Sequence, residues 1–350
     1  MTFVDRFDTI PLPTGRQAQR TQKVKKIIAE NAEIFTKMGN IKKISIGVIG
    51  VGHLGEKHAQ TLAKIDQAHL VGVCDTDEIK GCKIANTLGV AFFKDYRLLL
   101  DKVQAVIIAV PTKEHYSIAH QTLKQGCHAL IEKPITNNLK QAEELIRLSK
   151  RKHLILQVGH IERFNNAFKA VCDIVKEPKF IECHRLSPFP ARSLDIGVVA
   201  DLMIHDIDLI LDLVKSEVTY IDAVGINVLT PLEDIANVRL RFKNGCIANL
   251  TASRISDEAM RKFRIFLKNA YISVDYKNNR ATMYRKEDNK IVREEISIDE
   301  KSPLQDELEA FLESIIQNKP PLVSGQEAKQ ALDLAIKIQE KISDYIKTNR

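Results

Sequence analysis

The sequence lacks tryptophan altogether and has only six cysteines in 350 residues. The cysteines form no C-x-x-C pair and no cluster with histidine at zinc spacing, which argues against a disulfide framework and a metal site. No apolar run approaches the roughly 18 residues of a membrane-spanning helix, and the first residues lack the apolar core of a secretory signal. We therefore expect a cytoplasmic protein with buried thiols, no bound metal and no membrane span.

A large basic surface is also missing from most of the chain. The net charge is +7, but residues 1–43 alone carry nine Lys/Arg against four Asp/Glu. The remaining residues are nearly balanced, so the body of the protein offers no surface suited to nucleic acid. The length is sufficient for two domains with substantial cores.

Three regions differ in their patterns. Residues 1–43 form an extension, in which we expect disorder over 1–17 and an amphipathic helix over 18–38, either a docking helix or an appendage of little consequence. Residues 44–159 alternate short β-rich runs with helical stretches, which predicts a parallel sheet. Residues 160–350 begin with a helical region, a loop-rich stretch over 184–200 and a helix over 200–214. Successive strand-like runs between 218 and 297 then predict a mostly antiparallel sheet, followed by two helices.

The first strand-like run, Ile44–Ile49, ends in a glycine motif. Gly50, Gly52 and Gly55 form G-x-G-x-x-G between this strand and a helix. Such glycines permit a tight turn and a close approach of the backbone to a pyrophosphate, which the helix N-terminus binds. By itself the motif could also be a loop that only turns the chain.

An acidic residue strengthens the dinucleotide interpretation. Asp75 ends the second strand, 20 residues after Gly55. A carboxylate at this position accepts hydrogen bonds from the adenosine ribose and repels a 2′-phosphate. Asp75 could instead cap the next helix. The order of strand, glycine turn, helix, strand and acidic residue favours the dinucleotide site. The sequence therefore predicts a Rossmann-type, doubly wound sheet that binds NAD.

Two further turns follow apolar strands. Pro111, Thr112 and His115 belong to the sequence A-V-P-T-x-x-H, and Lys133 belongs to E-K-P. In a doubly wound sheet, ligands lie beyond the carboxyl ends of the strands, so both turns are expected near the cofactor. Thr112 could equally serve as a helix cap, and Lys133 as a surface lysine.

The predicted helix over 200–214 carries the remaining chemistry. Asp201 and His205 are spaced i and i+4, on one face, and Asp208 follows three residues later. A histidine oriented by a carboxylate is a suitable general base near neutral pH. The same residues could ligate a metal or form a solvated acidic face, but further ligands are not evident and the intervening residues are apolar.

The chain resembles the Gfo/Idh/MocA family of oxidoreductases over residues 44–346. The resemblance depends on four motifs in this order: the glycine motif, A-V-P-T-x-x-H, E-K-P and D-x-x-x-H-x-x-D. The resemblance implies a Rossmann domain, a C-terminal α+β domain with a large open sheet, and assembly into a homodimer or homotetramer. It implies NAD(P)-dependent oxidation of a sugar or cyclitol hydroxyl, with Lys133, Asp201 and His205 as catalytic residues. The expected cofactor-binding residues are Gly50, Gly52, His53, Leu54, Gly55, Asp75, Pro111, Thr112, His115 and Glu132.

A more specific resemblance starts at Val158, where V-G-H-I-E-R-F-N is similar to a segment of nucleotide-sugar dehydrogenases, with Asn166 in place of the usual proline. The stretch from His184 to His205 resembles the UDP-N-acetylglucosamine 3-dehydrogenase branch, which makes a 3-keto sugar for lipid A. That resemblance implies a nucleotide-sugar substrate, with arginines on the diphosphate. The expected substrate-binding residues are His160, Arg163, Asn165, Arg185 and Arg192. An inositol or free-sugar dehydrogenase, an NAD-dependent glycoside hydrolase and a non-catalytic regulator remain alternatives.

Overall fold

The structure is a computed structural model that describes residues 43–189, 196–288 and 290–348. The disorder and the helix expected for the N-terminal extension, and Arg192, lie outside these ranges. Residues 44–350 form one compact unit.

The first sheet has six parallel strands in the order β3-β2-β1-β4-β5-β6. This order confirms the doubly wound fold, in which the sheet reverses its winding between β1 and β4. The strands are β1 (Ile44–Ile49), β2 (Ala68–Cys74), β3 (Ala91–Phe93), β4 (Ala105–Ile108), β5 (His128–Glu132) and β6 (Leu156–Gly159). The helices between them are α2 (His53–Leu62), α3 (Glu78–Leu88), α4 (Tyr96–Leu100), α5 (Thr112–Lys124) and α6 (Leu139–Arg151). Both faces of the sheet bury apolar clusters, as its nearly continuous apolar strands predict.

The second sheet has eight strands in the order β14-β13-β12-β11-β7-β10-β9-β8. All neighbours are antiparallel except β7 and β10, which confirms the mostly antiparallel sheet. The strands are β7 (Phe180–Leu186), β8 (Val218–Ile226), β9 (Ile235–Phe242), β10 (Ile247–Ser253), β11 (Met260–Phe266), β12 (Ala270–Asp275), β13 (Arg280–Glu287) and β14 (Lys290–Ile296).

Strand β7 corrects the sequence-based expectation of a loop-rich stretch beginning at 184. Its inward residues are Ile181, Cys183 and Arg185, and all three are buried. A charged residue at an inward position breaks the apolar alternation that marks a strand. The strand is therefore recognisable only once the partners of Arg185 are known.

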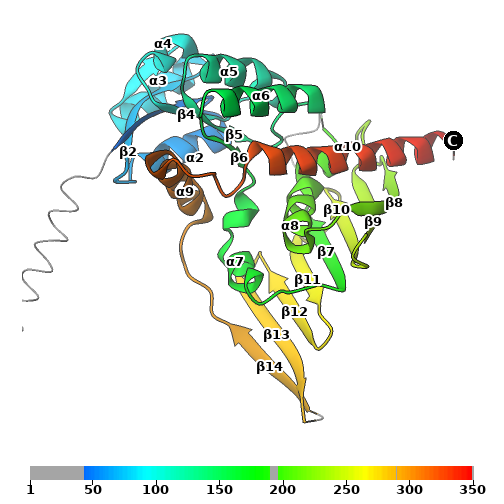
Figure 1. The fold of residues 1–350 in the computed structure, drawn as a ribbon. Coiled ribbons are helices and arrows are strands. Elements are labelled where there is room, and N and C mark those ends of the chain that lie inside the picture. Colours follow the sequence, from blue (N-terminus) through cyan, green and yellow to red (C-terminus); the bar gives the residue numbers. More distant parts are fainter. Residues whose placement is uncertain (1–42, 190–195, 289, 349–350) are drawn as a thin grey trace, which may run out of the picture. The chain divides into compact units, whose positions relative to one another are not determined.

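The helices of the second half connect the two sheets. They are the 3-10 turn η1 (Ile161–Phe164), α7 (Asn166–Cys172), the π-helical turn η2 (Val199–Met203), α8 (Ile204–Val214), α9 (Pro303–Gln317) and α10 (Gly325–Thr348). Helix α9 contributes Leu308 and Phe311 to a cluster of the first sheet. Helix α10 packs along α6 and also along α8 and β8 (Figure 1). Both C-terminal helices, which the sequence places in the second domain, therefore also pack against elements of residues 44–159.

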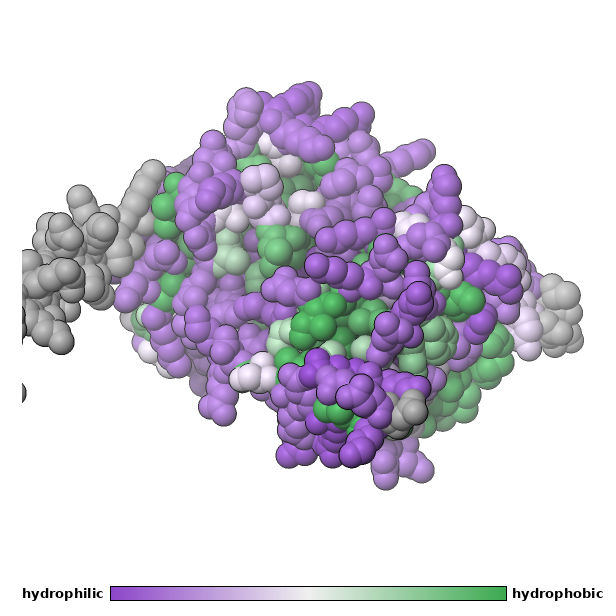
Figure 2. All heavy atoms as spheres, turned by 60° about the horizontal axis from the view of Figure 1, so that its bottom comes forward, coloured by the Kyte–Doolittle hydropathy of each residue, from purple (hydrophilic) through white to green (hydrophobic). Residues whose placement is uncertain are grey.

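The eight-stranded sheet buries one face and leaves the other partly exposed, as the alternating burial of its strands shows. The partly exposed face carries a row of rings, in which Phe266 and Tyr271 stack at 4.8 Å and Tyr271 and Tyr284 at 5.3 Å. Figure 2 shows a surface that is hydrophilic over most of the face turned forward, with hydrophobic residues gathered in its lower half. None of the helices in the described ranges is long and apolar enough to cross a membrane.

A buried carboxyl group lies where α9 meets the first sheet. Glu307 is fully buried, and neither of its carboxylate oxygens has a hydrogen-bond partner among the described residues. Desolvation, and then the negative charge of Glu132, hold the pKa of Glu307 well above its usual value. Burial therefore favours the protonated form of this group in the folded protein.

We expect Glu307→Gln to stabilise the protein at pH 8. As the pH rises above the ordinary carboxyl pKa, the unfolded chain loses this proton first, so the native glutamate lowers the free energy of unfolding. The substitution should recover roughly 1–3 kcal/mol at pH 8 and almost nothing near pH 4.5. Urea denaturation at both pH values measures this, with Glu313→Gln on the exposed side of α9 as the control. An equal effect at both pH values would contradict the assignment.

Candidate active site

The three glycines of the loop between β1 and α2 have different roles. Gly50 has φ +84°, and a Cβ there would lie 2.6 Å from the carbonyl oxygen of Ala109. A Cβ on Gly55 would overlap the carbonyl oxygen of Gly50, so only glycine allows this approach of helix to strand. At Gly52 a Cβ would meet nothing within 4 Å. The N-terminus of α2, which has no side-chain cap, therefore faces open space, and this arrangement fits the pyrophosphate of a dinucleotide.

Asp75 lies beside this loop at the end of β2. One carboxylate oxygen accepts the backbone N–H of Val51 at 2.7 Å and the other accepts that of Asp77 at 2.9 Å. A carboxylate has about four acceptor positions, so the group can hold the loop and still accept a ribose hydroxyl. Its predicted role is compatible with this geometry. Among the other expected cofactor residues, His53, Leu54 and Pro111 are exposed and Thr112 is half-buried at the helix starts.

Lys133 joins the two sheets. It follows β5, and its Nζ donates to the backbone oxygen of Asp201 at 2.6 Å and to a carboxylate oxygen of Asp201 at 3.1 Å. Asp201 lies in η2, directly before α8. The contact places the lysine loop of the first sheet against the helix that carries His205. The carboxylate of Asp201 pairs with the lysine in the structure, and its expected role, orienting the imidazole or holding a neighbouring hydroxyl, stays a prediction.

His205 lies on the first turn of α8, and its Nδ1 is buried without a hydrogen-bond partner in the described residues. Its ring lies 6.5 Å from that of His160, in an edge-on arrangement. Desolvation, with the positive charges of Lys133 and Arg185, holds the pKa of His205 well below its ordinary value. The imidazole is therefore neutral near pH 7 and able to accept a proton.

Two of the three arginines expected to bind a diphosphate, Arg163 and Arg185, are buried in ion pairs of this chain. Arg185 donates to both carboxylate oxygens of Asp206 and, at 2.8 Å, to Glu162. Arg163 pairs with Asp208 at 2.7 Å and with Asp212 at 2.9 Å. Both arginines are about 5% exposed. Both guanidinium groups therefore neutralise buried carboxylates of this chain, and removing either group would leave uncompensated buried charge. Their contact with a diphosphate stays a prediction.

Other expected contacts also prove to be internal. The ring nitrogens of His115 lie 2.8 Å from the carbonyl oxygen of Pro134 and 2.9 Å from that of Val110. His115 is buried between these two carbonyl oxygens and braces the Lys133 loop, and its contact with a cofactor stays a prediction. Asn165 caps α7 by accepting from the N–H of Ala167, and its substrate role stays a prediction.

His160 is buried, and neither of its ring nitrogens has a hydrogen-bond partner among the described residues. It lies beside His205 and stays a candidate.

Glu132 has a partner that sequence reasoning missed. Its Oε1 lies 2.7 Å from Nε2 of His58, on the buried face of α2. Burial alone would raise the pKa of Glu132, but the hydrogen bond and charge of His58, together with the charge of Lys133, lower it. A signal existed, since His58 lies three residues after Gly55, on the helix face that must pack against the sheet. Glu132 keeps its place beside the expected nicotinamide position as a prediction.

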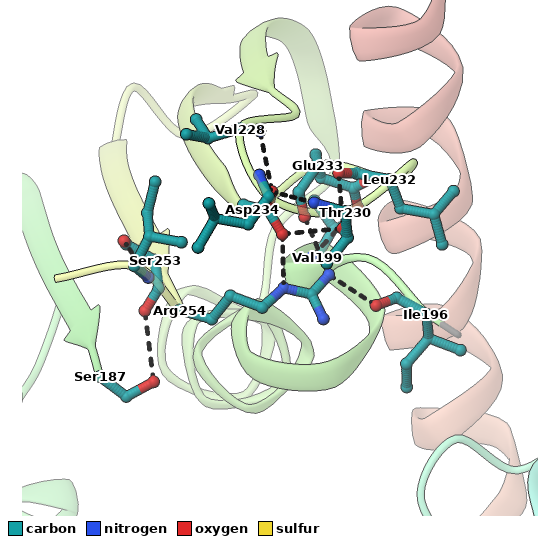
Figure 3. Close-up of polar contacts among 12 residues, drawn as sticks. Ser187, Ile196, Val199, Val228, Thr230, Leu232, Glu233, Asp234, Ser253 and Arg254 are labelled. Atoms are coloured by element: carbon teal, nitrogen blue, oxygen red, sulfur yellow. Dashed lines mark hydrogen bonds and ion pairs between the residues drawn. The ribbon is translucent and has the colours of Figure 1, made fainter. Parts of the chain in front are cut away.

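A second missed group supports the start of the catalytic helix (Figure 3). Asp234 is fully buried and accepts the N–H groups of Val228, Leu229 and Thr230. The same carboxylate pairs with Nε of Arg254 at 3.1 Å. No local pattern reveals this pair, because it joins a loop to the end of β10.

Arg254 also hydrogen-bonds to the segment that precedes η2. Its Nη2 donates to the carbonyl oxygens of Ile196 and Glu233 at 2.7 and 3.1 Å. The carbonyl oxygen of Glu233 in turn accepts the N–H of Val198 at 3.1 Å. A Cβ on Gly197 would overlap the Glu233 carboxylate, so a larger residue there would have to displace that side chain. The pair formed by Arg254 and Asp234 therefore positions the turn that carries Asp201.

These features define the class of protein: an oxidoreductase that uses a nicotinamide dinucleotide and builds its site from two sheets. Residues 44–160 match the oxidoreductase family with an NAD-binding Rossmann fold, and residues 177–273 match the GFO/IDH/MocA C-terminal domain. The chain belongs to the Gfo/Idh/MocA family, as its motifs predicted.

Several relatives match nearly the whole chain. The UDP-N-acetylglucosamine 3-dehydrogenase of Acidithiobacillus ferrooxidans is 37% identical over 86% of this chain and 97% of its own. Its solved structure superposes with a TM-score of 0.83 at 36% identity, covering 87% of this chain and 99% of that one. The myo-inositol 2-dehydrogenase of Thermotoga maritima is 28% identical over 85% of this chain and 96% of its own.

We expect Asp234→Ala to destabilise the protein by about 3–5 kcal/mol, because it leaves the Arg254 guanidinium buried without its carboxylate. Dehydrogenase turnover should fall as well, since the support of η2 is lost. Chemical denaturation and an NADH assay measure the two effects. The matched control is Glu294→Ala, which removes the half-exposed partner of Arg285 and should cost less than about 1 kcal/mol. Equal losses in the two variants would contradict the supporting role.

Proposed function

We propose that this protein is an NAD-dependent dehydrogenase that oxidises the C3 hydroxyl of a UDP-N-acetylhexosamine, most simply UDP-N-acetylglucosamine. The observation that supports the proposal is the contact between Lys133 and Asp201, which links the loop after β5 to the turn directly before the helix of His205. The relative that is 37% identical bears the name of this activity.

In the proposed reaction the substrate hydroxyl lies between Lys133 and His205. NAD, held by the glycine loop and Asp75, supplies the acceptor for a hydride. His205 accepts the hydroxyl proton, and the C–H hydrogen leaves C3 with its electron pair, so that a C3 ketone forms. Lys133 donates a hydrogen bond to the oxygen as negative charge develops on it. Asp201 holds the ammonium group in place and can accept a neighbouring sugar hydroxyl.

The direction of the proton transfer follows from the surroundings of the two bases. The pKa of His205 is lowered by desolvation and by neighbouring cations, so it is unprotonated before substrate arrives. Lys133 lies against two oxygen atoms of Asp201, an arrangement that favours an ammonium donor. We therefore assign the proton acceptor to His205 and the electrostatic role to Lys133.

The setting proposed for this activity follows from its product. A 3-keto nucleotide sugar suits amination in the synthesis of lipid A or of a surface polysaccharide, which takes place in the cytoplasm. We propose a homodimer or homotetramer, with the partly exposed face of the eight-stranded sheet between copies. We also propose that residues 44–159 bind NAD, that residues 160–350 bind the sugar, and that residues 1–43 are an extension.

We expect NADH to accumulate when the protein is incubated with NAD and UDP-N-acetylglucosamine. A panel of UDP-sugars, free sugars and inositols, followed at the NADH absorbance, tests this. A preference for myo-inositol or for free glucose would refute the nucleotide-sugar assignment. Release of a sugar without net NADH would indicate the glycoside hydrolase, because that reaction regenerates NAD. Binding of NAD without turnover of any member would indicate a regulator.

We expect Lys133→Ala to lower turnover by at least about 100-fold, because the developing alkoxide loses its cationic donor. The affinity for NAD should change little, since the lysine lies beyond the glycine loop. Steady-state assays and calorimetric titration with NAD separate the two quantities. Lys140→Ala, an exposed lysine at the start of α6, is the control and should behave as the wild type. Full activity of Lys133→Ala would remove the lysine from the mechanism.

A further inference from the structure

Arg163 and Arg185 are already paired with buried carboxylates, so another cation in the described part of the chain is a better candidate for the diphosphate of the proposed substrate. We propose that Arg261, on the second residue of β11, binds this diphosphate and sets the preference for nucleotide sugars over free sugars. This inference rests on the proposed function, because it concerns the substrate of that same site. Neither the sequence motifs nor the family resemblance pointed to this residue.

The register of the sheet places Arg261 at the correct end of the second domain. It is the direct neighbour of Arg185 across the antiparallel pair of β11 and β7. Directly paired residues project to the same face, so Arg261 lies on the inward face, as do Phe263 and Ile265 of its own strand. These two residues are fully buried, whereas Arg261 is exposed. The inward row of β11 therefore runs from the apolar core to the margin where Arg185 contacts α8.

The charges around Arg261 leave it available for a ligand. Three arginines lie at this end of the sheet, and two of them have buried carboxylate partners: Arg185 with Asp206 and Arg254 with Asp234. Arg261 forms no ion pair with any residue in the described ranges. Its charge nevertheless acts on Asp206 and on His205, contributing after burial to the lowered pKa of the imidazole. An exposed, unpaired guanidinium thus lies within electrostatic reach of the proposed base.

The chemistry of the substrate matches this position. In a UDP-sugar the diphosphate is attached at C1, which is separated from C3 only by C2. A sugar with its C3 hydroxyl at His205 therefore holds its diphosphate close to the base, where Arg261 projects. The planar guanidinium can donate two parallel hydrogen bonds to phosphate oxygens, and it loses no internal ion pair in doing so.

The test compares Arg261→Ala with the wild type, using the full chain loaded with NAD. We expect the variant to bind UDP about tenfold to 100-fold more weakly in calorimetric titrations and to show a similar rise in KM for UDP-N-acetylglucosamine. Uridine, which has no phosphate, should bind both proteins equally. Arg261→Lys should recover part of the affinity. The matched control is Lys262→Ala, which removes a cation from the next residue, on the opposite face of β11, and should change neither value.

Two outcomes would overturn the inference: undiminished binding of UDP to Arg261→Ala while the wild type oxidises UDP-N-acetylglucosamine, or an equal loss of affinity for uridine and for UDP. The first leaves the proposed function intact. Arg261-dependent binding of UDP without oxidation of any UDP-sugar would support the diphosphate role and refute the proposed oxidation. The two failures are thereby distinguishable.

Discussion

The site depends on one contact, the pair of bonds from the Lys133 ammonium to the backbone and side chain of Asp201. Each partner comes from a different sheet: the lysine from the loop after β5, and the aspartate from the π-helical turn before α8. Without this contact the glycine loop would be a cofactor site with no chemistry beside it. The contact links the lysine loop to the helix that carries His205, and the proposed mechanism uses both side chains on one hydroxyl.

Both partners are held by buried polar groups that have no direct contact with a substrate. On the lysine side, His58 fixes Glu132, and His115 bonds to the carbonyl of Pro134. On the aspartate side, the Asp234–Arg254 pair holds the carbonyls before η2. Such groups are costly to bury, and each has a partner from another segment of the chain. These buried polar and charged groups therefore fix the positions of the lysine loop and of the turn that carries Asp201.

The difference between the expected and observed arginines shows where sequence reasoning reached its limit. Arg163 and Arg185 lie in segments that resemble nucleotide-sugar dehydrogenases, and an arginine near a substrate is a reasonable diphosphate ligand. Their carboxylate partners, Asp208 and Asp206, lie on α8, more than 20 residues away in the chain. Arg261 could have been placed on the inward face from its alternation with Phe263 and Ile265, but the sequence does not reveal that it has no ion-pair partner among the described residues.

The sequence by itself determined the doubly wound sheet, the dinucleotide loop, the acidic residue after β2, the family, and the lysine and histidine motifs. All of these are local: a glycine turn, a strand period or a helical spacing depends on neighbouring residues. Only the tertiary structure decided that Asp201 binds Lys133, that His115 braces the lysine loop, and which arginines are occupied. The physical reason is that the free energy of a buried charge depends on which opposite charge meets it, and those partners come together only when the chain has folded.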